Sequence, residues 1–289
     1  MAKTVSAEAK TGWLLVAPPG LYTALLLAAP LATVLIYSVL TKVGGQVGLP
    51  FTLDNYTEVF THPIYRAVML RSLTVSLLVT ATTVLLAYPI AYYVSFHVAP
   101  SKKSLWLFLI TIPFWTSYII RVSLWRTILG YDGIVDSMLM GVGLASEPVN
   151  ILANGVTSIV ITLSHAYAPF AVLPIFVSLE KVDRSLLEAG QDLGESKFMT
   201  FLRVTLPLSM PGVIAAVLIV FIPTVGDYVT PELIGGGKTP MIANLIEVEM
   251  LKKNNKAMGS AIAVAAMMIV ALVSVVFVLW NRRFLGGRK

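Results

Sequence analysis

Long apolar runs alternate with short polar connections along the whole chain. Six of these runs are long enough to cross about 30 Å of hydrocarbon as helices. They cover residues 13–40, 68–96, 105–120, 151–177, 213–230 and 258–280. The alternation therefore predicts an all-α, polytopic membrane protein with about six transmembrane helices.

Prolines interrupt several of the apolar runs, including Pro113 in the third and Pro223 in the fifth. Each proline removes a backbone donor and frees carbonyl groups, which membranes tolerate where neighbouring helices or a water-filled cavity satisfy them. Proline is also commoner in transmembrane helices than in soluble ones. Kinked helices around a cavity and an ordinary membrane composition are therefore both open interpretations.

Composition excludes a soluble domain. Hydrophobic residues make up 57% of the 289 residues and charged residues only 12%, whereas about a quarter of a soluble domain is charged. The net charge of +6 would suit nucleic acid, but it is spread over loops that flank the apolar runs, which is typical of membrane topology. We expect the lipid bilayer, and no nucleic acid, as a partner.

The apolar runs form one continuous series. The first run is too long for the core of a signal peptide, so it should remain as the first helix. No shift in composition divides the chain, and we expect a single transmembrane domain over residues 1–289. Between the third and fourth runs, residues 131–144 place apolar side chains on one helical face, which predicts a short surface helix.

The most informative polar region is residues 178–210, which we call the charged segment. Asp183 is one candidate N-cap, and Ser185, followed three positions on by Glu188, is another. A short helix should therefore begin at residue 184 or 186. Gly194 is suited to end this helix in a left-handed conformation.

A second short helix should follow in the charged segment. Phe198, Phe201 and Leu202 lie on one side at helical spacing. We expect Pro207 and Pro211 to stop this helix before the fifth apolar run begins. The charged segment is then a pair of short helices between two spans.

The spacing of the charged segment resembles that of a known loop. It reads E-A-G, three residues, G, nine residues, V-x-L-P, and closely resembles the E-A-A…G…I-x-L-P loop of membrane subunits of ATP-binding-cassette (ABC) importers. Two positions depart from the pattern, because a glycine replaces the second alanine and a valine replaces the isoleucine. The residues that carry the resemblance are Glu188, Ala189, Gly190, Gly194, Val204, Leu206 and Pro207.

Three further segments narrow the resemblance. Residues 51–56 read F-T-L-D-N-Y, residues 112–116 read I-P-F-W-T, and residues 225–236 read V-G-D-Y-V-T-P-E-L-I-G-G. All three look like segments of the first permease subunit of spermidine and putrescine importers. With them, the resemblance extends from the first span to the sixth.

The resemblance implies a permease fold of the type I ABC importers, with the charged segment as a cytoplasmic coupling helix. It implies half of a translocation pathway for polyamines or related small amines in the bacterial inner membrane. The implied partners are a second homologous permease, two ATP-binding cassette subunits and a periplasmic substrate-binding protein. ATP and Mg²⁺ would lie on the cassette subunits, so this chain is expected to be no enzyme and to hold no cofactor.

One segment resembles part of a nucleotide-binding loop. Residues 235–239 read G-G-G-K-T, but a phosphate-binding loop needs a glycine five positions before Gly237, where Glu232 stands. We see no metal-ligand spacing and no nucleophile motif, so no catalytic residue and no metal site are predicted.

The distribution of basic residues predicts the orientation. An even number of spans places both termini on one side, together with the charged segment and the turn at residues 101–103. More than half of the 21 Lys and Arg residues then lie on that side. Because cytoplasmic loops are enriched in Lys and Arg, we expect both termini and the charged segment to be cytoplasmic.

Asp227 is the best candidate for contact with a cationic substrate. It lies in an otherwise apolar run, where an ionisable group is costly and is a functional hypothesis by default. A carboxylate is also the natural partner of an amine. The alternative is that Asp227 pairs with Arg121 or Arg126 and only holds helices together.

Aromatic residues and a second carboxylate complete the candidate substrate pathway. Trp115, Tyr118 and Tyr228 would offer ring faces to a cation, and Glu232 would add a carboxylate near the outer mouth. Packing or anchoring at the membrane interface is the alternative role of the three rings. His165 has no second histidine or carboxylate one helical turn away, so we expect a neighbouring helix to satisfy it.

Other functions stay open at this point. An importer of another small organic solute, such as an amino-acid-like compound, is an alternative interpretation. A secondary transporter driven by an ion gradient is a different mechanism, which predicts internal repeats, discontinuous helices or paired carboxylates within the membrane. A membrane-embedded enzyme is a third possibility, but no convergent set of catalytic residues supports it.

Overall fold

The computed structural model describes residues 7–235 and 238–285. Gly236 and Gly237, which belong to the sequence segments 225–236 and 235–239, lie outside the described residues. The chain divides into two compact units, of which one combines Met1–His62 with Ile246–Ala265 and the other combines Pro63–Leu245 with Ala266–Lys289. The helix α13, Lys256–Trp280, runs through both units. The single domain expected from the sequence stays a prediction.

The first unit contains a β-hairpin that the sequence analysis did not predict. Its two strands pair antiparallel, with Val43 opposite Gln46. Gly44 and Gly45 between them have φ values of 58° and 83°, and two successive residues with positive φ form the tight turn that matches strand twist. The elements of this part are α1 Ala7–Ser38, β1 Leu40–Val43, β2 Gln46–Phe51 and α2 Asp54–Thr61.

The motif at residues 51–56 has a structural role in this unit. The side chain of Asn55 donates to the carbonyl oxygens of Ser38 at 3.0 Å and Leu40 at 2.9 Å. The Tyr56 hydroxyl donates to the Ser38 hydroxyl at 2.7 Å. The two bonds from Asn55 satisfy carbonyl groups at the end of α1 and at the start of β1, so the motif holds the junction between the first span and the hairpin.

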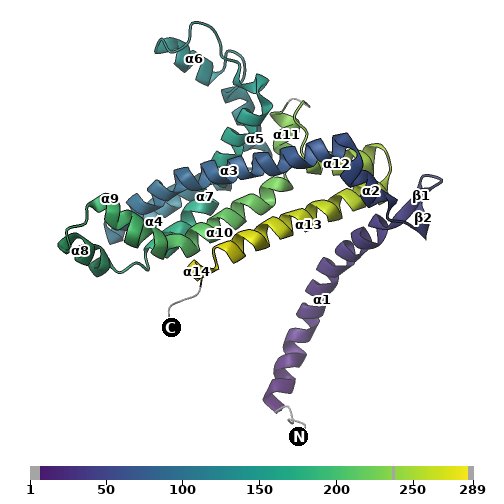
Figure 1. Cartoon of the computed structure of the whole chain (residues 1–289), viewed down its shortest axis with the longest axis horizontal. Coiled ribbons are helices and arrows are strands. Elements are labelled where there is room, and N and C mark those ends of the chain that lie inside the picture. Colours follow the sequence, from purple (N-terminus) through teal and green to yellow (C-terminus); the bar gives the residue numbers. More distant parts are fainter. Residues whose placement is uncertain (1–6, 236–237, 286–289) are drawn as a thin grey trace. The chain divides into compact units, whose positions relative to one another are not determined.

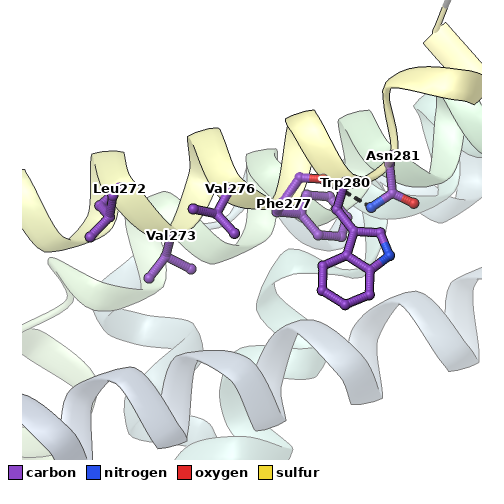
Figure 2. A pocket seen from close by; sticks show the side chains of 6 residues that line it. All are labelled: Leu272, Val273, Val276, Phe277, Trp280 and Asn281. Carbon is purple, nitrogen blue, oxygen red and sulfur yellow. Dashed lines mark hydrogen bonds between the residues drawn. The ribbon is translucent and has the colours of Figure 1, made fainter.

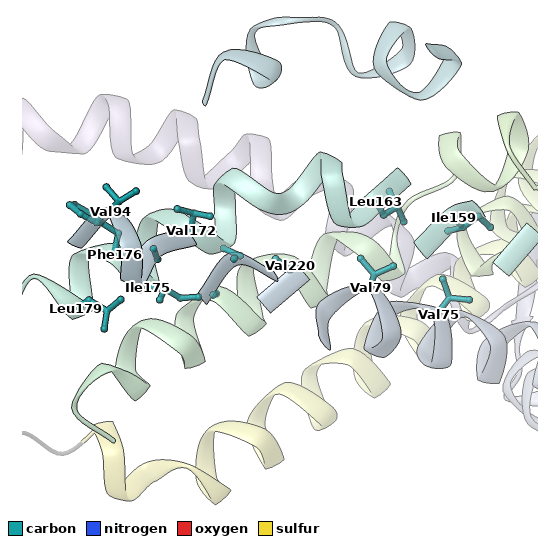
Figure 3. Packing of buried hydrophobic residues seen from close by; sticks show 14 of the residues in the cluster. Val75, Val79, Val94, Ile159, Leu163, Val172, Ile175, Phe176, Leu179 and Val220 are labelled. Carbon is teal, nitrogen blue, oxygen red and sulfur yellow. The ribbon is translucent and has the colours of Figure 1, made fainter. Parts of the chain in front are cut away.

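Three helices form the core of the second unit (Figure 1): α3 Pro63–Phe96, α7 Gly155–Leu179 and α10 Leu206–Val225. Each helix contacts the other two. Their facing side chains are mostly branched and aliphatic, and they form one buried cluster (Figure 3) that includes Val75, Val79, Ile159, Leu163, Val172, Ile175 and Val220.

A glycine allows α7 and α10 to approach closely. A Cβ atom added to Gly212 would clash with the carbonyl oxygen of Pro174 and would lie 2.5 Å from Ser178 Cβ and 3.1 Å from Ile175 Cα. Any other residue at this position would therefore push the two helices apart.

The predicted membrane helices are present with shifted ends. Among the described residues, five helices are long and apolar enough to cross a membrane, and a bent pair would make a sixth. The helical, polytopic class is confirmed. The second span begins at Pro63, before the apolar run, and α10 ends at Val225, before the run at residues 213–230 is complete.

The prediction that Pro207 and Pro211 stop the second short helix of the charged segment is wrong. The short helix α9 Lys197–Thr200 continues through a π-helical turn, Phe201–Thr205, into α10. In this turn Leu206 donates its N–H to the carbonyl oxygen five residues back. The wider turn makes room for the Pro207 ring, which would clash with the preceding turn of a regular helix.

Several short helices lie outside the core. The predicted surface helix at residues 131–144 is present but shorter, as α6 Ile134–Gly141. A π-helical turn, Val248–Lys252, leads from α12 toward α13. The remaining short helices are α11 Val229–Leu233, α12 Ile242–Glu247 and α14 Arg282–Leu285.

The second half of α13 carries a shallow cavity of about 550 Å³ (Figure 2). The Asn281 amide at its end donates to the carbonyl oxygen of Phe277 at 2.9 Å, which leaves an apolar surface. Such a surface suits lipid chains or an apolar helix. The cavity is lined by Leu272, Val273, Val276, Phe277, Trp280 and Asn281.

Candidate substrate site and coupling segment

The third span is a broken helix. The helix α4 Pro100–Thr111 leads into a 3-10 turn, Ile112–Trp115, and α5 Tyr118–Ile128 continues at 87° to it. The two residues between the helices have extended backbone. The structure thus replaces the single helix expected over residues 105–120 by two, because Pro113 has no N–H to donate and the extended residues end the helix.

A buried arginine lies at this break. Thr116 Oγ1 and Arg121 Nη1 donate to the carbonyl oxygen of Pro113 at 2.8 and 2.9 Å. Arg121 is only 7% exposed, and its guanidinium carbon lies 5.8 Å from the ring centroids of both Phe114 and Tyr118. Within the described part of the chain its Nε atom has no hydrogen-bond partner. The break therefore buries a cation against two aromatic rings.

Asp227 lies between α10 and α11, directly after the fifth span, and is 7% exposed. Its Oδ1 atom accepts the N–H groups of Val229 at 3.1 Å and Thr230 at 3.4 Å. This is how a carboxylate caps the start of a helix. The role of Thr230 was not predicted, although the spacing D-x-x-T is the available sequence signal.

The third and fifth spans meet at a group that we call the Asp227 cluster: Tyr118, Asp227 and Thr230. The Tyr118 hydroxyl donates to Asp227 Oδ2 at 2.8 Å and lies 2.8 Å from Thr230 Oγ1. Two of the predicted site residues, Tyr118 and Asp227, are thus brought together. Their contact joins the helix after the break to the residues that follow α10.

The donors to Asp227 are all neutral. Of the ion pairs found in residues 7–235 and 238–285, none includes Asp227, so a pair with Arg121 or Arg126 is not observed. A buried carboxylate is costly in a medium of low dielectric constant when no cation compensates it. The arrangement leaves Asp227 suited to attract a cation from outside the chain.

The other candidate residues have exposed side chains and no recorded contact with the carboxylate among the described residues. Trp115 is 80% exposed and Tyr228 is 53% exposed, and Glu232 is exposed as well. Asn244 donates its side-chain amide to the carbonyl oxygen of Tyr228 at 2.9 Å, so this residue is held by its backbone. These three side chains remain predictions for the substrate pathway.

His165 is satisfied by a neighbouring helix, as expected. The indole Nε1 of Trp125 on α5 donates to His165 Nδ1 on α7 at 3.1 Å, and the two rings pack edge to face with centroids 5.3 Å apart. This contact fastens α5 to α7 beside the break.

The charged segment begins with the predicted short helix, α8 Arg184–Asp192. Asp183 is its N-cap, because its side chain accepts the N–H of Ser185 at 3.0 Å. The same hydrogen bond lowers the pKa of Asp183 below its ordinary value. Gly194 has a φ of 88° and ends the helix in the left-handed conformation, as predicted. The structure thus selects Asp183 over Ser185 as the cap.

The residues of the importer-like loop fall into two groups. Glu188 and Ala189 are exposed on α8. Gly190 packs against Thr200, where an added Cβ would lie 3.3 Å from the Thr200 methyl group. The half-buried residues of the V-x-L-P part lie in the π-helical turn and at the start of α10; they are Val204, Leu206 and Pro207.

Large apolar side chains are also exposed on the charged segment. Leu193 is 86% exposed, Phe198 is 68% exposed and Leu186 is 47% exposed. Beside them stand polar and charged residues, including the ion pair of Arg203 with Glu195 at 2.7 Å. Exposed apolar side chains with a polar rim are typical of a surface that binds another protein.

Comparison with known proteins decides the family. Residues 64–285 match the family described as binding-protein-dependent transport system inner membrane component. The chain belongs to this family. The permease is 38% identical over 261 residues to the spermidine/putrescine transport system permease protein PotB of Haemophilus influenzae, which covers 90% of each chain.

Solved structures support the fold. A bacterial ABC transporter involved in the import of the acidic polysaccharide alginate matches with a TM-score of 0.72 at 18% identity, over 96% of this chain and 97% of that one. The bacterial alginate ABC transporter in complex with an alginate pentasaccharide-bound periplasmic protein matches with a TM-score of 0.67 at 20% identity, over 95% and 94%. The fold of an ABC importer permease, predicted from the sequence, is confirmed.

The chain is therefore a multi-pass inner membrane permease subunit of an ABC importer, closely related to PotB. Permeases of this family work with a substrate-binding protein. A discontinuous helix, which the rival hypothesis of an ion-coupled transporter predicts, is present in the third span. It does not favour that rival here, because the family assigns the chain to the importers.

Proposed function

We propose that this permease forms half of the translocation pathway for polyamines, such as spermidine and putrescine, or for related small amines. It pairs with a second homologous permease. Two ATP-binding cassette subunits hold ATP and Mg²⁺, and a periplasmic substrate-binding protein delivers the amine. The similarity to PotB over most of both chains supports this substrate class.

The Asp227 cluster is the observation that carries the proposal. Within the described part of the chain, this buried carboxylate has neutral donors only, and at such a site a desolvated ammonium group gains the most from charge. The ring of Tyr118 adjoins the carboxylate, and an aromatic face also favours a cation. The exposed Trp115 and Tyr228 rings, with Glu232, extend this path toward the outer mouth.

Arg121 favours a second candidate, an importer of an amino-acid-like solute. Its buried guanidinium and Asp227 both contact Tyr118, the first through a ring contact and the second through a hydrogen bond. A zwitterion has a carboxylate for Arg121 and an ammonium group for Asp227. A polyamine has only cationic groups, and Arg121 would repel those that pass near it.

Reconstitution separates the two candidates. The permease, its partner permease, the cassette subunits and the binding protein are placed in liposomes, and uptake of labelled spermidine, putrescine and a set of amino acids is measured. ATP-dependent uptake of the polyamines is expected. Uptake of an amino acid alone would favour the second candidate, and uptake by the isolated chain under an ion gradient would contradict an importer.

We place both termini and the charged segment in the cytoplasm. The basic residues Arg282 and Arg283 lie in α14, directly after the last span, where positive charge has the strongest effect on orientation. Glu188 and Ala189 would then contact a cassette subunit, together with the exposed Leu193 and Phe198 side chains.

Cross-linking tests this docking surface. The chain has no cysteine, so Glu188→Cys introduces a single thiol. We expect it to cross-link to a cassette subunit that carries a thiol in its docking cleft. The matched control is Gly141→Cys on α6, an exposed position in open space. Equal cross-linking of the two variants would contradict the docking surface.

A further inference from the structure

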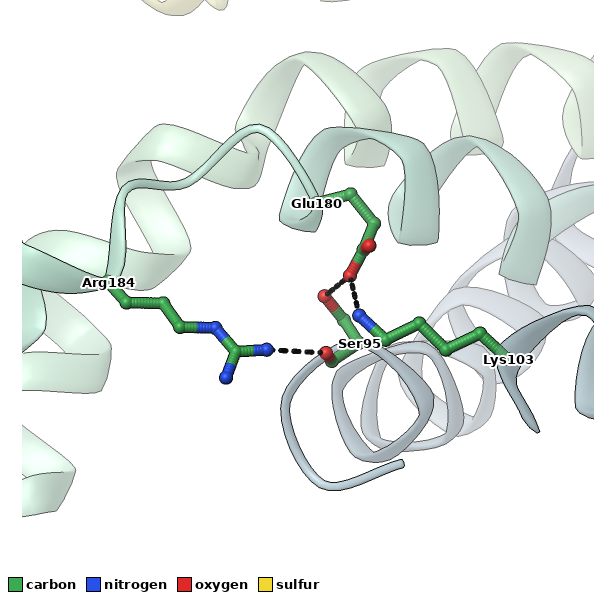
Figure 4. A network of polar contacts seen from close by, with 4 residues as sticks. All are labelled: Ser95, Lys103, Glu180 and Arg184. Atoms are coloured by element: carbon green, nitrogen blue, oxygen red, sulfur yellow. Dashed lines mark hydrogen bonds and ion pairs between the residues drawn. The ribbon is translucent and has the colours of Figure 1, made fainter. Parts of the chain in front are cut away.

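Four polar residues from four different elements meet at one end of the second unit (Figure 4). We call them the Glu180 cluster: Ser95 in the last turn of α3, Lys103 near the start of α4, Glu180 directly after α7, and Arg184 at the start of α8. Glu180 Oε1 accepts the Ser95 hydroxyl at 2.6 Å and Lys103 Nζ at 2.6 Å. Arg184 Nη2 donates to the carbonyl oxygen of Ser95 at 3.3 Å.

The two partners of the ion pair in the Glu180 cluster differ in exposure, since the Glu180 side chain is 36% exposed. The Lys103 side chain is only 13% exposed, and its Nζ lies 6.0 Å from the centroid of the Phe176 ring. Partial burial raises the pKa of Glu180, but the hydrogen bonds from Lys103 and Ser95 and the charges of Lys103 and Arg184 outweigh it. The pKa therefore lies below its ordinary value, and the carboxylate stays charged in its contacts.

The cluster gives α8 a connection to helices that do not adjoin it in sequence. Along the chain, α8 leads back to α7 and forward through α9 to α10. Through Arg184 it also contacts the end of α3, and the neighbouring Glu180 holds the start of α4 by way of Lys103. Arg184 therefore links α8 to the end of the second span, and Glu180, which follows α7, links the residues before α8 to the third span.

The helix α4 connects the cluster to the break in the third span. Its 12 residues form a rod of roughly 18 Å. One end holds Lys103, and the other end leads into the 3-10 turn Ile112–Trp115 that precedes Tyr118. A turn between two helices is where their relative orientation changes when they move, and in this chain that turn lies directly before Tyr118, which donates to Asp227.

We propose that Lys103 and Glu180 are positioning residues that carry motion of α8 to α4, and through the break to the Asp227 cluster. The inference rests on the proposed docking of a cassette subunit on α8, and it adds a second route to the covalent one through α10. Movement driven by ATP would then reach the Asp227 cluster by two routes. One runs through α4 to Tyr118, and the other runs through α10 to Asp227.

The test compares two neighbouring lysines in the reconstituted transporter. Lys103→Met removes the contact with Glu180, whereas Lys102→Met changes an exposed lysine on the same turn. Uptake and ATP hydrolysis are measured together, and their ratio reports coupling. We expect the ratio to fall about fivefold or more in Lys103→Met and to stay unchanged in Lys102→Met. Glu180→Gln should resemble Lys103→Met, and Lys103→Arg should retain most of the coupling.

A double variant tests whether the two residues act as a pair. Lys103→Met with Glu180→Gln should lower the ratio no further than either change alone. If the wild-type complex transports and both single variants keep the wild-type ratio, this inference is overturned while the proposed function still stands. The same is true of a lower melting temperature with an unchanged ratio, which would mark a purely structural contact. A wild-type complex that hydrolyses ATP without uptake would overturn the proposed function as well.

Discussion

Two carboxylates, Glu180 and Asp227, organise two clusters that differ in burial and in the charge of their partners. Glu180 follows α7 and has its cation within the chain, because Lys103 contacts it at 2.6 Å. Asp227 follows α10, is more deeply buried, and receives only neutral donors from the residues that the structure describes. An ion pair that is already complete holds helices together, whereas an uncompensated carboxylate leaves a place for an external cation. On this difference rest our proposals that the Glu180 cluster transmits motion and that the Asp227 cluster binds the substrate.

The largest effect is expected where the helices that precede the two carboxylates touch. Gly212→Ala places a methyl group against Pro174 and Ser178, so α10 should move away from α7 at a cost of about 1–3 kcal/mol. Thermal unfolding of the purified protein measures this. Gly141→Ala, in open space on α6, is the matched control and should not destabilise. Equal melting temperatures for Gly212→Ala and wild type would contradict the close packing of α7 and α10, the helices that precede the two carboxylates.

Neutralising the uncompensated carboxylate should have the next largest effect. Asn still accepts the hydroxyl of Tyr118 and caps a helix about as well as Asp, so Asp227→Asn should fold normally. Loss of the charge should reduce polyamine uptake about tenfold. Uptake assays on the reconstituted complex provide the measurement, with Tyr118→Phe as the variant that removes the hydrogen bond and keeps the ring. Full uptake by Asp227→Asn would reduce Asp227 to a helix cap.

A smaller effect is expected beyond the Glu180 cluster, at the end of α8. Gly194 has open space around it but a φ of 88°, so Gly194→Ala should cost about 1–2 kcal/mol through backbone strain alone. The ratio of uptake to ATP hydrolysis should fall. Gly194→Asn should keep more of it, because Asn tolerates the left-handed conformation. Identical ratios of uptake to ATP hydrolysis in both variants and wild type would show that the turn at Gly194 has no part in coupling.

The smallest effect concerns pH. The pKa of Glu180 is lower in the folded protein than its ordinary value of 4.5, so its contribution to stability is fully present above that value. It is lost as pH falls through the lower, folded pKa. The difference in melting temperature between wild type and Glu180→Gln should therefore be constant above about pH 5.5 and shrink in acid. A difference that changes near neutral pH would contradict the ion pair.

Local patterns were sufficient for much of the fold. Apolar runs predicted the spans, and the N-cap signal at Asp183 with Gly194 predicted both ends of α8, because these features depend on neighbouring residues only. The Gly44–Gly45 hairpin was missed although its turn residues are local. The continuous helix through Pro207 was missed because a π-helical turn, which leaves no periodic signal, makes room for the proline.

The sites divide in the same way. A lone carboxylate in an apolar run was sufficient to select Asp227, and Tyr118 was named on its aromatic ring. Nothing in the sequence indicated that Tyr118 donates to Asp227, because 109 residues separate them. The expected partner, Arg121, instead bonds the carbonyl group freed at Pro113. A break in a helix leaves backbone groups without partners, and these groups can bind a side chain that would otherwise pair with a charge. The spacing of residues in the sequence does not show which partner a side chain takes.

The sequence by itself determined the class of protein, the helices and the family-like loop, since hydrophobicity, caps and turn residues act over short distances. Only the tertiary structure decided that, among the described residues, Glu180 has a cationic partner and Asp227 has none. That distinction depends on contacts between helices far apart in the chain: Lys103 with Glu180, and Tyr118 with Asp227. A charged side chain is compensated by groups that lie near it in space, whatever their distance along the sequence. For this reason only the folded structure distinguishes the Glu180 cluster from the Asp227 cluster.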